Sequence, residues 1–124
     1  MQKQDMELNR FKFEGLLIWQ RAMKLGEDIN KLTENFPHKE LYNLSSQIGR
    51  AGDSIALNIS EGSIIQSKPE FRKFLGYAIR SLAEVVTCLF KAWNRLYISK
   101  NEFDKYYVDS FNLMNMMVAF RRKI

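Results

Sequence analysis

Four segments of the chain repeat apolar residues at the three- and four-residue spacing of an amphipathic helix. They cover about residues 14–35, 41–61, 68–98 and 100–122. Pro37 falls between the first two segments and Pro69 in the first turn of the third, where proline is tolerated. No stretch alternates between apolar and polar residues as a strand does. The pattern predicts an all-α fold, an antiparallel up-down four-helix bundle over residues 13–124, with residues 1–12 as a flexible tail.

Each predicted helix carries its core residues on one face. Serines at 67 and 99, each followed three residues later by glutamate, predict N-caps with capping boxes, and Gly62 predicts the end of the second helix. Gly49 and Gly52 share one face of that helix, which predicts close approach of a neighbour. The predicted core is Ile18, Ala22, Leu25, Ile29, Leu32, Phe36, Leu44, Ile48, Ala51, Ile55, Ile59, Phe71, Leu75, Ala78, Leu82, Val85, Leu89, Ala92, Leu96, Phe103, Tyr106, Ser110, Leu113, Met117 and Phe120.

The segment SIALNISEG, residues 54–62, mixes polar residues into a helix that has little solvent face. Buried polar groups persist in a fold only when they are hydrogen-bonded, and an unpaired one costs on the order of 1–3 kcal/mol. We therefore predict a structural polar network between the second and third helices, formed by Gln47, Arg50, Ser54, Asn58, Glu61, Ser81 and Glu84.

A second group of apolar residues lies away from the core stripes. Leu16, Trp19 and Met23 project from the first helix, and Leu57 projects from the outward side of the second. Apolar groups exposed at helical spacing indicate a contact with another chain, so these four residues are the predicted oligomer interface.

Charge is unevenly distributed along the 124 residues, whose net charge is +5. Residues 1–66 hold 8 lysines and arginines against 9 acidic residues, whereas residues 67–124 hold 11 against 5. A basic half favours a polyanionic partner, although a solvated surface and compensation of the last helix dipole are alternative interpretations. The candidate nucleic-acid-binding residues are Lys73, Arg80, Lys91, Arg95, Arg121, Arg122 and Lys123.

The sequence offers little for catalysis. His38 is the only histidine, no Glu-x-x-His motif occurs, and Cys88 is the only cysteine. We predict no catalytic residue, no metal site and no cofactor. The single cysteine, the absence of a membrane-spanning apolar run and the polar N-terminus indicate a cytoplasmic protein. Because the catalytic and metal-binding motifs are missing, we expect that it is not an enzyme.

The same segments resemble a known family. The pieces are FEGLLIWQRAMKL, FPHKELYNLSSQIGRAGDSIALNISEG, EFRKFLGYAIRSLAEV and the aromatic-rich last helix. They are similar to the four-helix bundle proteins first described as encoded in intervening sequences of bacterial 23S ribosomal RNA genes. The usual Ala-Glu-Gly of that family is Ser60-Glu61-Gly62 here.

The resemblance implies a ring-like homopentamer. It also implies a relation to the accessory variability proteins of diversity-generating retroelements, basic pentamers that bind nucleic acid and a reverse transcriptase. We therefore expect an oligomeric assembly or adaptor module, with RNA or an RNP as its candidate partner. An accessory subunit of a reverse transcriptase and a purely structural scaffold are the alternatives.

Overall fold

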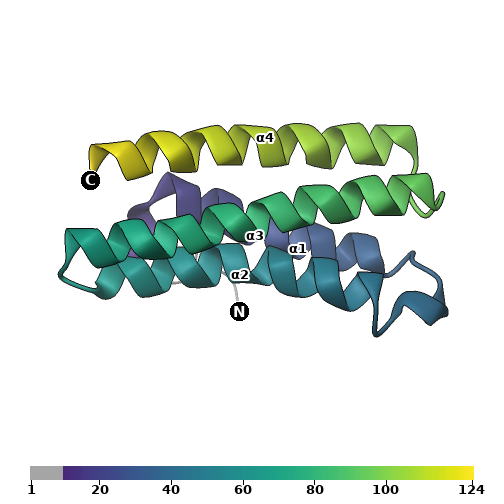
Figure 1. Cartoon of the computed structure of the whole chain (residues 1–124), viewed down its shortest axis with the longest axis horizontal. Coiled ribbons are helices and arrows are strands. Elements are labelled where there is room, and N and C mark those ends of the chain that lie inside the picture. The colour runs from purple at the N-terminus through teal and green to yellow at the C-terminus, as the bar shows by residue number, and fades with distance from the viewer. Residues whose placement is uncertain (1–9) are drawn as a thin grey trace.

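Four antiparallel α-helices lie side by side along one long axis in the computed structural model, which describes residues 10–124 (Figure 1). The loop between α3 and α4 is short, so the C-terminal end of α4 lies at the same end of the bundle as the start of α3. The elements in order are η2 (Lys12–Gly15), α1 (Leu17–Thr33), η3 (His38–Glu40), α2 (Leu44–Ile64), α3 (Lys68–Asn94) and α4 (Lys100–Lys123).

Each helix packs against the next one along the chain, and α4 closes the bundle against α1. Within residues 10–124, the α2–α3 and α1–α2 interfaces are the most extensive, and the α1–α4 interface is the smallest of the four. This confirms the predicted all-α, up-down four-helix bundle. It also leaves α4 as the helix that is held mainly from one side, by α3.

The core follows the helical periodicity. Every predicted core residue of the first two helices is buried, and Ile29, Ile48 and Ile55 are completely inaccessible. On α4 the predicted face is buried at its centre, while Tyr106 and Phe120 are half-buried at its edges. Positions spaced at about 3.6 residues share one face of a helix, which is why this pattern was readable from the sequence.

Leu96 is the predicted core residue that the structure places in solvent, with 86% of its surface exposed. Helix α3 ends at Asn94, and Leu96 has a left-handed backbone conformation with a φ of 64°. Its N–H donates to the carbonyl oxygen of Trp93, and Tyr97 N–H donates to that of Ala92. These two bonds form a Schellman motif, in which glycine usually occupies the position that Leu96 has here.

Glycines mark the closest approach of α1 to α2, as Gly49 and Gly52 predicted. A Cβ on Gly26 would lie 3.1 Å from the carbonyl oxygen of Gly52, and one on Gly49 would lie 3.2 Å from Asn30 Oδ1. Gly62 does not end α2, which continues to Ile64. A Cβ on Gly62 would lie 2.7 Å from Phe74 Cβ, so this glycine lets α3 approach closely instead.

The helix starts are capped largely as the sequence indicates. Ser99 Oγ accepts from Glu102 N–H at 3.1 Å, and Ser99 N–H donates to Glu102 Oε1 at 2.9 Å, which completes a capping box. Ser67 Oγ accepts from Glu70 N–H at 3.4 Å and so caps α3, but the predicted capping box is not completed there. Residues 1–9 of the predicted tail lie outside the described residues.

The rest of that predicted tail is tied to the bundle. Lys12 begins the turn η2, and its Nζ lies 5.8 Å from the centroid of the Phe71 ring. Phe11 stacks on Phe13, which in turn packs against Trp19 with ring centroids 5.0 Å apart. The segment before α1 therefore covers part of the first helix.

Candidate functional site

A polar groove lies between α2 and α3 where the sequence predicts a network. Ser54 Oγ and Ser81 Oγ are hydrogen-bonded at 2.9 Å, and Asn58 Nδ2 donates to Ser54 Oγ at 3.0 Å and to its carbonyl oxygen at 2.9 Å. Gln47 Nε2 donates to Glu84 Oε2 at 3.4 Å across the same two helices. These bonds link the polar flanks of α2 and α3.

Two members of the predicted network stand apart from these bonds. Arg50 is exposed at the edge of the groove, and within the described part of the chain its side chain makes no hydrogen bond. Glu61 is exposed on the surface of α2 and is likewise outside the hydrogen-bonded group. Because solvent hydrates its carboxylate, Glu61 needs no protein partner, and we correct its predicted role accordingly.

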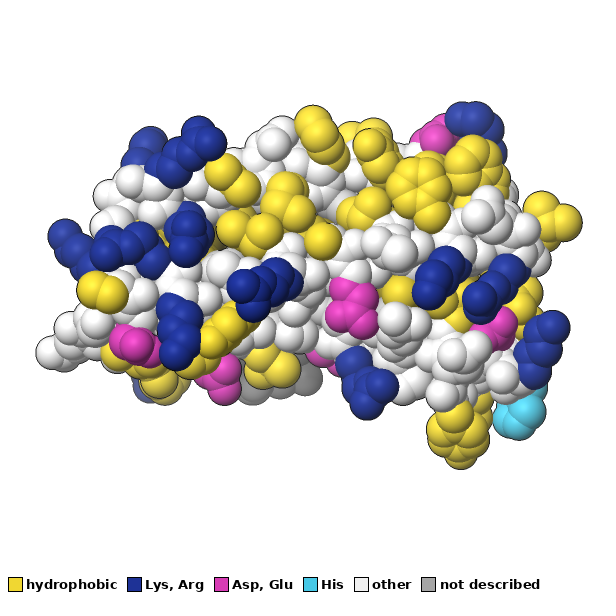
Figure 2. Space-filling model, in the orientation of Figure 1, with side chains coloured by type: hydrophobic (Ala, Val, Ile, Leu, Met, Phe, Trp, Pro, Cys, Tyr) yellow, Lys and Arg dark blue, Asp and Glu magenta, His cyan; other side chains and the backbone are white. Residues whose placement is uncertain are grey.

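A strongly basic hollow of about 480 Å³ lies where the first half of α3 meets the end of α4. We call it the basic hollow. Its cations are Arg72, Lys73 and Arg80 of α3 and Arg121 of α4, and no acidic residue is among those that line it in the described chain. Figure 2 shows lysines and arginines gathered at this end of the molecule. Such a surface attracts anions.

The stripe of cations predicted along the third helix is divided into two groups. Lys91 lies about 16 Å from Arg80 along α3, and the exposed carboxylate of Glu84 lies on the same face between them. Figure 2 shows acidic side chains between two separate groups of basic ones. Arg122 and Lys123 are exposed at the end of α4, near the basic hollow in sequence but outside its lining.

Arg95 belongs to a different site, at the opposite end of the bundle. Its Nη1 forms an ion pair with Glu40 Oε2 at 3.1 Å, and Tyr97 Oη donates to the same oxygen at 2.6 Å. Glu40 Oε1 accepts from Asn43 Nδ2 at 2.9 Å and from Leu44 N–H at 3.3 Å. This buried carboxylate joins η3, the start of α2 and the α3–α4 loop.

The titration of this cluster follows from its contacts. The hydrogen bond from Tyr97, with help from the Leu44 N–H and the charge of Arg95, lowers the pKa of Glu40 against the opposing effect of burial. The same hydrogen bond and burial raise the pKa of Tyr97. Both pKa shifts favour the ionised glutamate and the neutral tyrosine. The cluster, which we call the Glu40 clasp, therefore has a structural role, and Arg95 is engaged within it.

Three of the four predicted interface residues pack within the chain itself. Leu16, Trp19 and Met23 are half-buried against the bundle core, and Phe13 covers part of the Trp19 ring. Leu57 is exposed over 59% of its surface, as predicted. The helical pattern alone does not reveal the contact of Phe13 from η2 with Trp19, and the interface at these residues stays a prediction.

The larger exposed apolar surface runs along α3 and α4 instead. Phe90, Tyr107, Val108 and Phe111 are exposed, and we call them the apolar strip. Ring centroids are 6.1 Å apart between Phe90 and Tyr107 and 6.5 Å apart between Tyr107 and Phe111, so the aromatic members are contiguous. Figure 2 shows hydrophobic side chains gathered on this side of the molecule.

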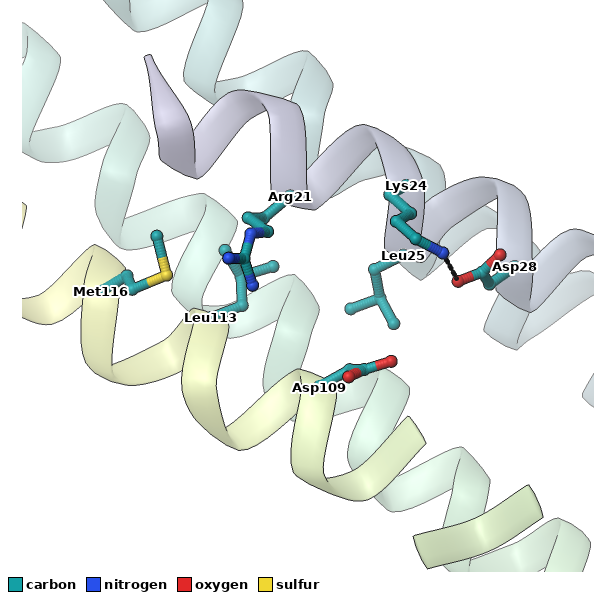
Figure 3. Close-up of a pocket in the computed structure, with 7 residues that line it drawn as sticks. All are labelled: Arg21, Lys24, Leu25, Asp28, Asp109, Leu113 and Met116. Carbon is teal, nitrogen blue, oxygen red and sulfur yellow. Dashed lines mark hydrogen bonds and ion pairs between the residues drawn. The ribbon is translucent and has the colours of Figure 1, made fainter. Parts of the chain in front are cut away.

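A third hollow, of about 310 Å³, opens between α1 and α4, where the bundle is least tightly closed (Figure 3). Asp109 points from α4 toward α1, and Lys24 is paired with Asp28 at 3.0 Å. The hydrogen bond with Asp28 and the charge of that carboxylate raise the pKa of Lys24. With Arg21, this hollow holds two cations and two carboxylates, so its charges compensate one another.

Cys88 is completely buried, and burial raises the pKa of its thiol, which disfavours the reactive thiolate. Within residues 10–124, no group of three or more His, Cys, Asp or Glu side chains is arranged to hold a metal ion. No helix in that part of the chain is long and apolar enough to cross a membrane.

Comparison with known proteins identifies the family. A family model described as 23S rRNA-intervening sequence protein matches residues 14–119. The chain belongs to the 23S rRNA-intervening sequence protein family. The family match confirms the resemblance drawn from SIALNISEG and its neighbouring segments, whereas the relation to retroelement accessory proteins stays a prediction.

A solved member of a similar group shares the fold. The crystal structure at 1.70 Å of a protein of unknown function from the S23 ribosomal protein family of Bacteroides thetaiotaomicron VPI-5482 superposes with a TM-score of 0.76. It is 22% identical, and the alignment covers 85% of this chain and 98% of that one. No curated protein matches the chain.

The sequence analysis did not predict several of the residues that the structure places at these sites. Arg72 of the basic hollow adjoins Lys73 but was not assigned to the outward face. Tyr107 and Phe111, four residues apart and off the core stripe of α4, carried a detectable signal of an exposed apolar face. Glu40 carried none, because its partners Arg95 and Tyr97 are 55 and 57 residues away.

Proposed function

We propose that this member of the 23S rRNA-intervening sequence protein family is a non-enzymatic assembly module that self-associates and contacts RNA. The observation that carries the proposal is the apolar strip on α3 and α4, whose four large side chains are exposed in the single chain. Burying apolar surface contributes about 25 cal/mol per Å². A second copy of the chain is therefore a favourable partner for this face.

The strip has the features of an interface centre. Its aromatic rings are contiguous with the buried Phe103, whose ring centroid is 4.8 Å from that of Phe90 and 5.6 Å from that of Tyr107. Rings supported in this way lose little side-chain entropy when a partner covers them. Aromatic residues are also enriched at the centres of protein interfaces. We propose a ring-like pentamer, as the family resemblance implies.

RNA is the partner that charge and family description both favour. The second half of the chain carries most of the positive charge, and four of its cations converge on the basic hollow. The family's description, 23S rRNA-intervening sequence protein, refers to an RNA. We propose that one assembled particle presents several such basic surfaces to the same RNA, which increases avidity without new contacts.

The two strongest candidates for reactive groups, Cys88 and Glu40, both favour a role without catalysis. The thiol of Cys88 is buried and its pKa is raised, and the carboxylate of Glu40 is fully engaged by its neighbours. We therefore propose a binding and assembly role for the chain.

Light scattering across micromolar protein concentrations tests the assembly. The wild type should have the mass of several protomers, and Phe111→Asp should lower it, because an interface does not accept an unpaired charge. Leu57→Asp tests the alternative interface that the sequence predicts on α2: it places the same charge at a similarly exposed residue, and the mass should be retained if the apolar strip is the interface. A monomeric wild type would refute self-association. A loss of mass in Leu57→Asp alone would move the interface to α2.

A further inference from the structure

We propose that the basic hollow is the binding site for the phosphodiester backbone of single-stranded RNA. This inference rests on the proposed RNA contact and assigns it to one place on the surface. The hollow brings together three guanidinium groups and one ammonium group from α3 and α4. Arginines supply planar sets of donors that match phosphate oxygens, and lysine adds a mobile point charge.

Two of the guanidinium groups are held in position by main-chain oxygen atoms. Arg121 Nε donates to the carbonyl oxygen of Arg72 at 2.8 Å, and Arg72 Nη1 donates to the main-chain oxygen of Ile124 at 2.5 Å. Within the described chain, Nη1 and Nη2 of Arg121 make no hydrogen bond, since the bond to Arg72 is made by Nε. The side chains are thus ordered before binding while donors remain free, which reduces the entropy lost when a phosphate is bound.

Gly76 is one of the residues that line the hollow. It lies one helical turn after Arg72 and one turn before Arg80, and a Cβ there would be 3.9 Å from Arg121 Nη2. The absence of a side chain leaves the guanidinium of Arg121 lying over the α3 backbone and open to the hollow. A larger side chain at this position would occupy the space that a phosphate needs.

The shape of the hollow favours a chain of phosphates over a single anion. Arg72 and Arg80 are about 12 Å apart along α3, so the cations form a row and not a point. Tyr77 lies beside this row, with Arg80 5.9 Å from its ring centroid and Phe74 in edge contact. Cations that follow a backbone next to aromatic rings are the usual features of single-strand binding.

Binding of a fluorescent single-stranded RNA of mixed sequence, measured by anisotropy at low and moderate salt, tests the site. Gly76→Asp places a carboxylate among the guanidinium groups and should weaken binding by about tenfold or more, because it repels phosphate and pairs with Arg121. Gly76→Ala is the matched control. It adds the Cβ without charge and should bind within about twofold of the wild type, because the added atom makes an ordinary contact.

A second pair of variants separates the local site from overall charge. Lys73→Gln with Arg80→Gln removes two cations of the hollow, and Lys31→Gln with Lys39→Gln removes two exposed cations elsewhere. Only the first pair should lower the slope of log K against log salt, by roughly 1.4, since each phosphate contact on a single strand contributes about 0.7. Circular dichroism and light scattering confirm that each variant is folded and assembled.

The outcomes distinguish this inference from the proposed function. If the wild type binds RNA but both double variants weaken it equally, the RNA contact stands and the basic hollow is refuted as its site. If the wild type fails to bind RNA even at low salt, the RNA contact and the hollow are both refuted, while self-association stands on its own measurement. Binding to phosphatidylserine vesicles without binding to RNA would also overturn the inference.

Discussion

Replacing Gly62 by alanine tests how closely α2 and α3 are packed. An added Cβ would lie 2.7 Å from Phe74 Cβ and 3.0 Å from Phe71 Cδ1, whereas carbon atoms pack favourably at about 3.5–4.0 Å. The Phe71 ring can rotate slightly, but Phe74 Cβ is fixed to the α3 backbone. The substitution therefore forces the two helices apart.

The magnitude follows from two opposing terms. Alanine is favoured over glycine inside a helix by about 1 kcal/mol. Overpacking a core costs about 1–3 kcal/mol, and contact with a backbone-fixed atom places Gly62 near the upper end of that range. We expect Gly62→Ala to lower the free energy of unfolding by about 2 kcal/mol. Gly76→Ala, whose Cβ meets only Arg121 at 3.9 Å, should raise it by about 1 kcal/mol.

Urea denaturation followed by circular dichroism measures both effects. With a slope of about 2 kcal/mol per molar urea, the midpoint should fall by about 1 M in Gly62→Ala and rise by about 0.5 M in Gly76→Ala. Protein concentration must be equal in all samples, because self-association contributes to apparent stability. A midpoint that rises in both variants would refute the close packing at Gly62, since helix propensity alone would then explain the data.

Two further predictions concern the end of the bundle that holds Glu40. Because its partners lower its pKa, the Glu40 carboxylate stabilises the fold at neutral pH, and this contribution is lost as the pH falls below about 4 through the lowered pKa. Glu40→Gln should therefore lower the urea midpoint at neutral pH by an amount that shrinks in acid; a pH-independent difference would contradict the ionised clasp. Leu96→Gly should stabilise the chain by about 0.5–1 kcal/mol in the same assay, because Leu96 has a positive φ and is exposed. An unchanged or lower midpoint would indicate that its side chain makes a stabilising contact.

The spacing of apolar residues determined most of the architecture. Residues three and four positions apart share a helix face, so the core of α1 and α2 could be assigned residue by residue before any tertiary contact was known. The capping box at Ser99 was equally readable, because its bonds span three residues. The glycines of α2 indicated close approach, although not which atoms they would meet.

Tertiary structure decided the remaining features, because they depend on groups far apart in sequence. Whether a helix continues through Gly62 or ends before Leu96 is settled by the neighbouring backbone and the local hydrogen bonds, and not by apolar spacing. The segment before α1 places the Phe13 ring against Trp19, so a predicted interface residue is partly covered within the chain.

Charge shows most clearly what the sequence determines and what only the tertiary structure determines. The sequence alone established that the second half of the chain is basic, because net charge is a sum over residues. It did not establish that Arg121 lies over Gly76, 45 positions earlier, or that Arg95 is paired with Glu40. Electrostatic interaction depends on distance in space, so only the tertiary structure separated the cations that line the basic hollow from Arg95, which is engaged by Glu40 of η3.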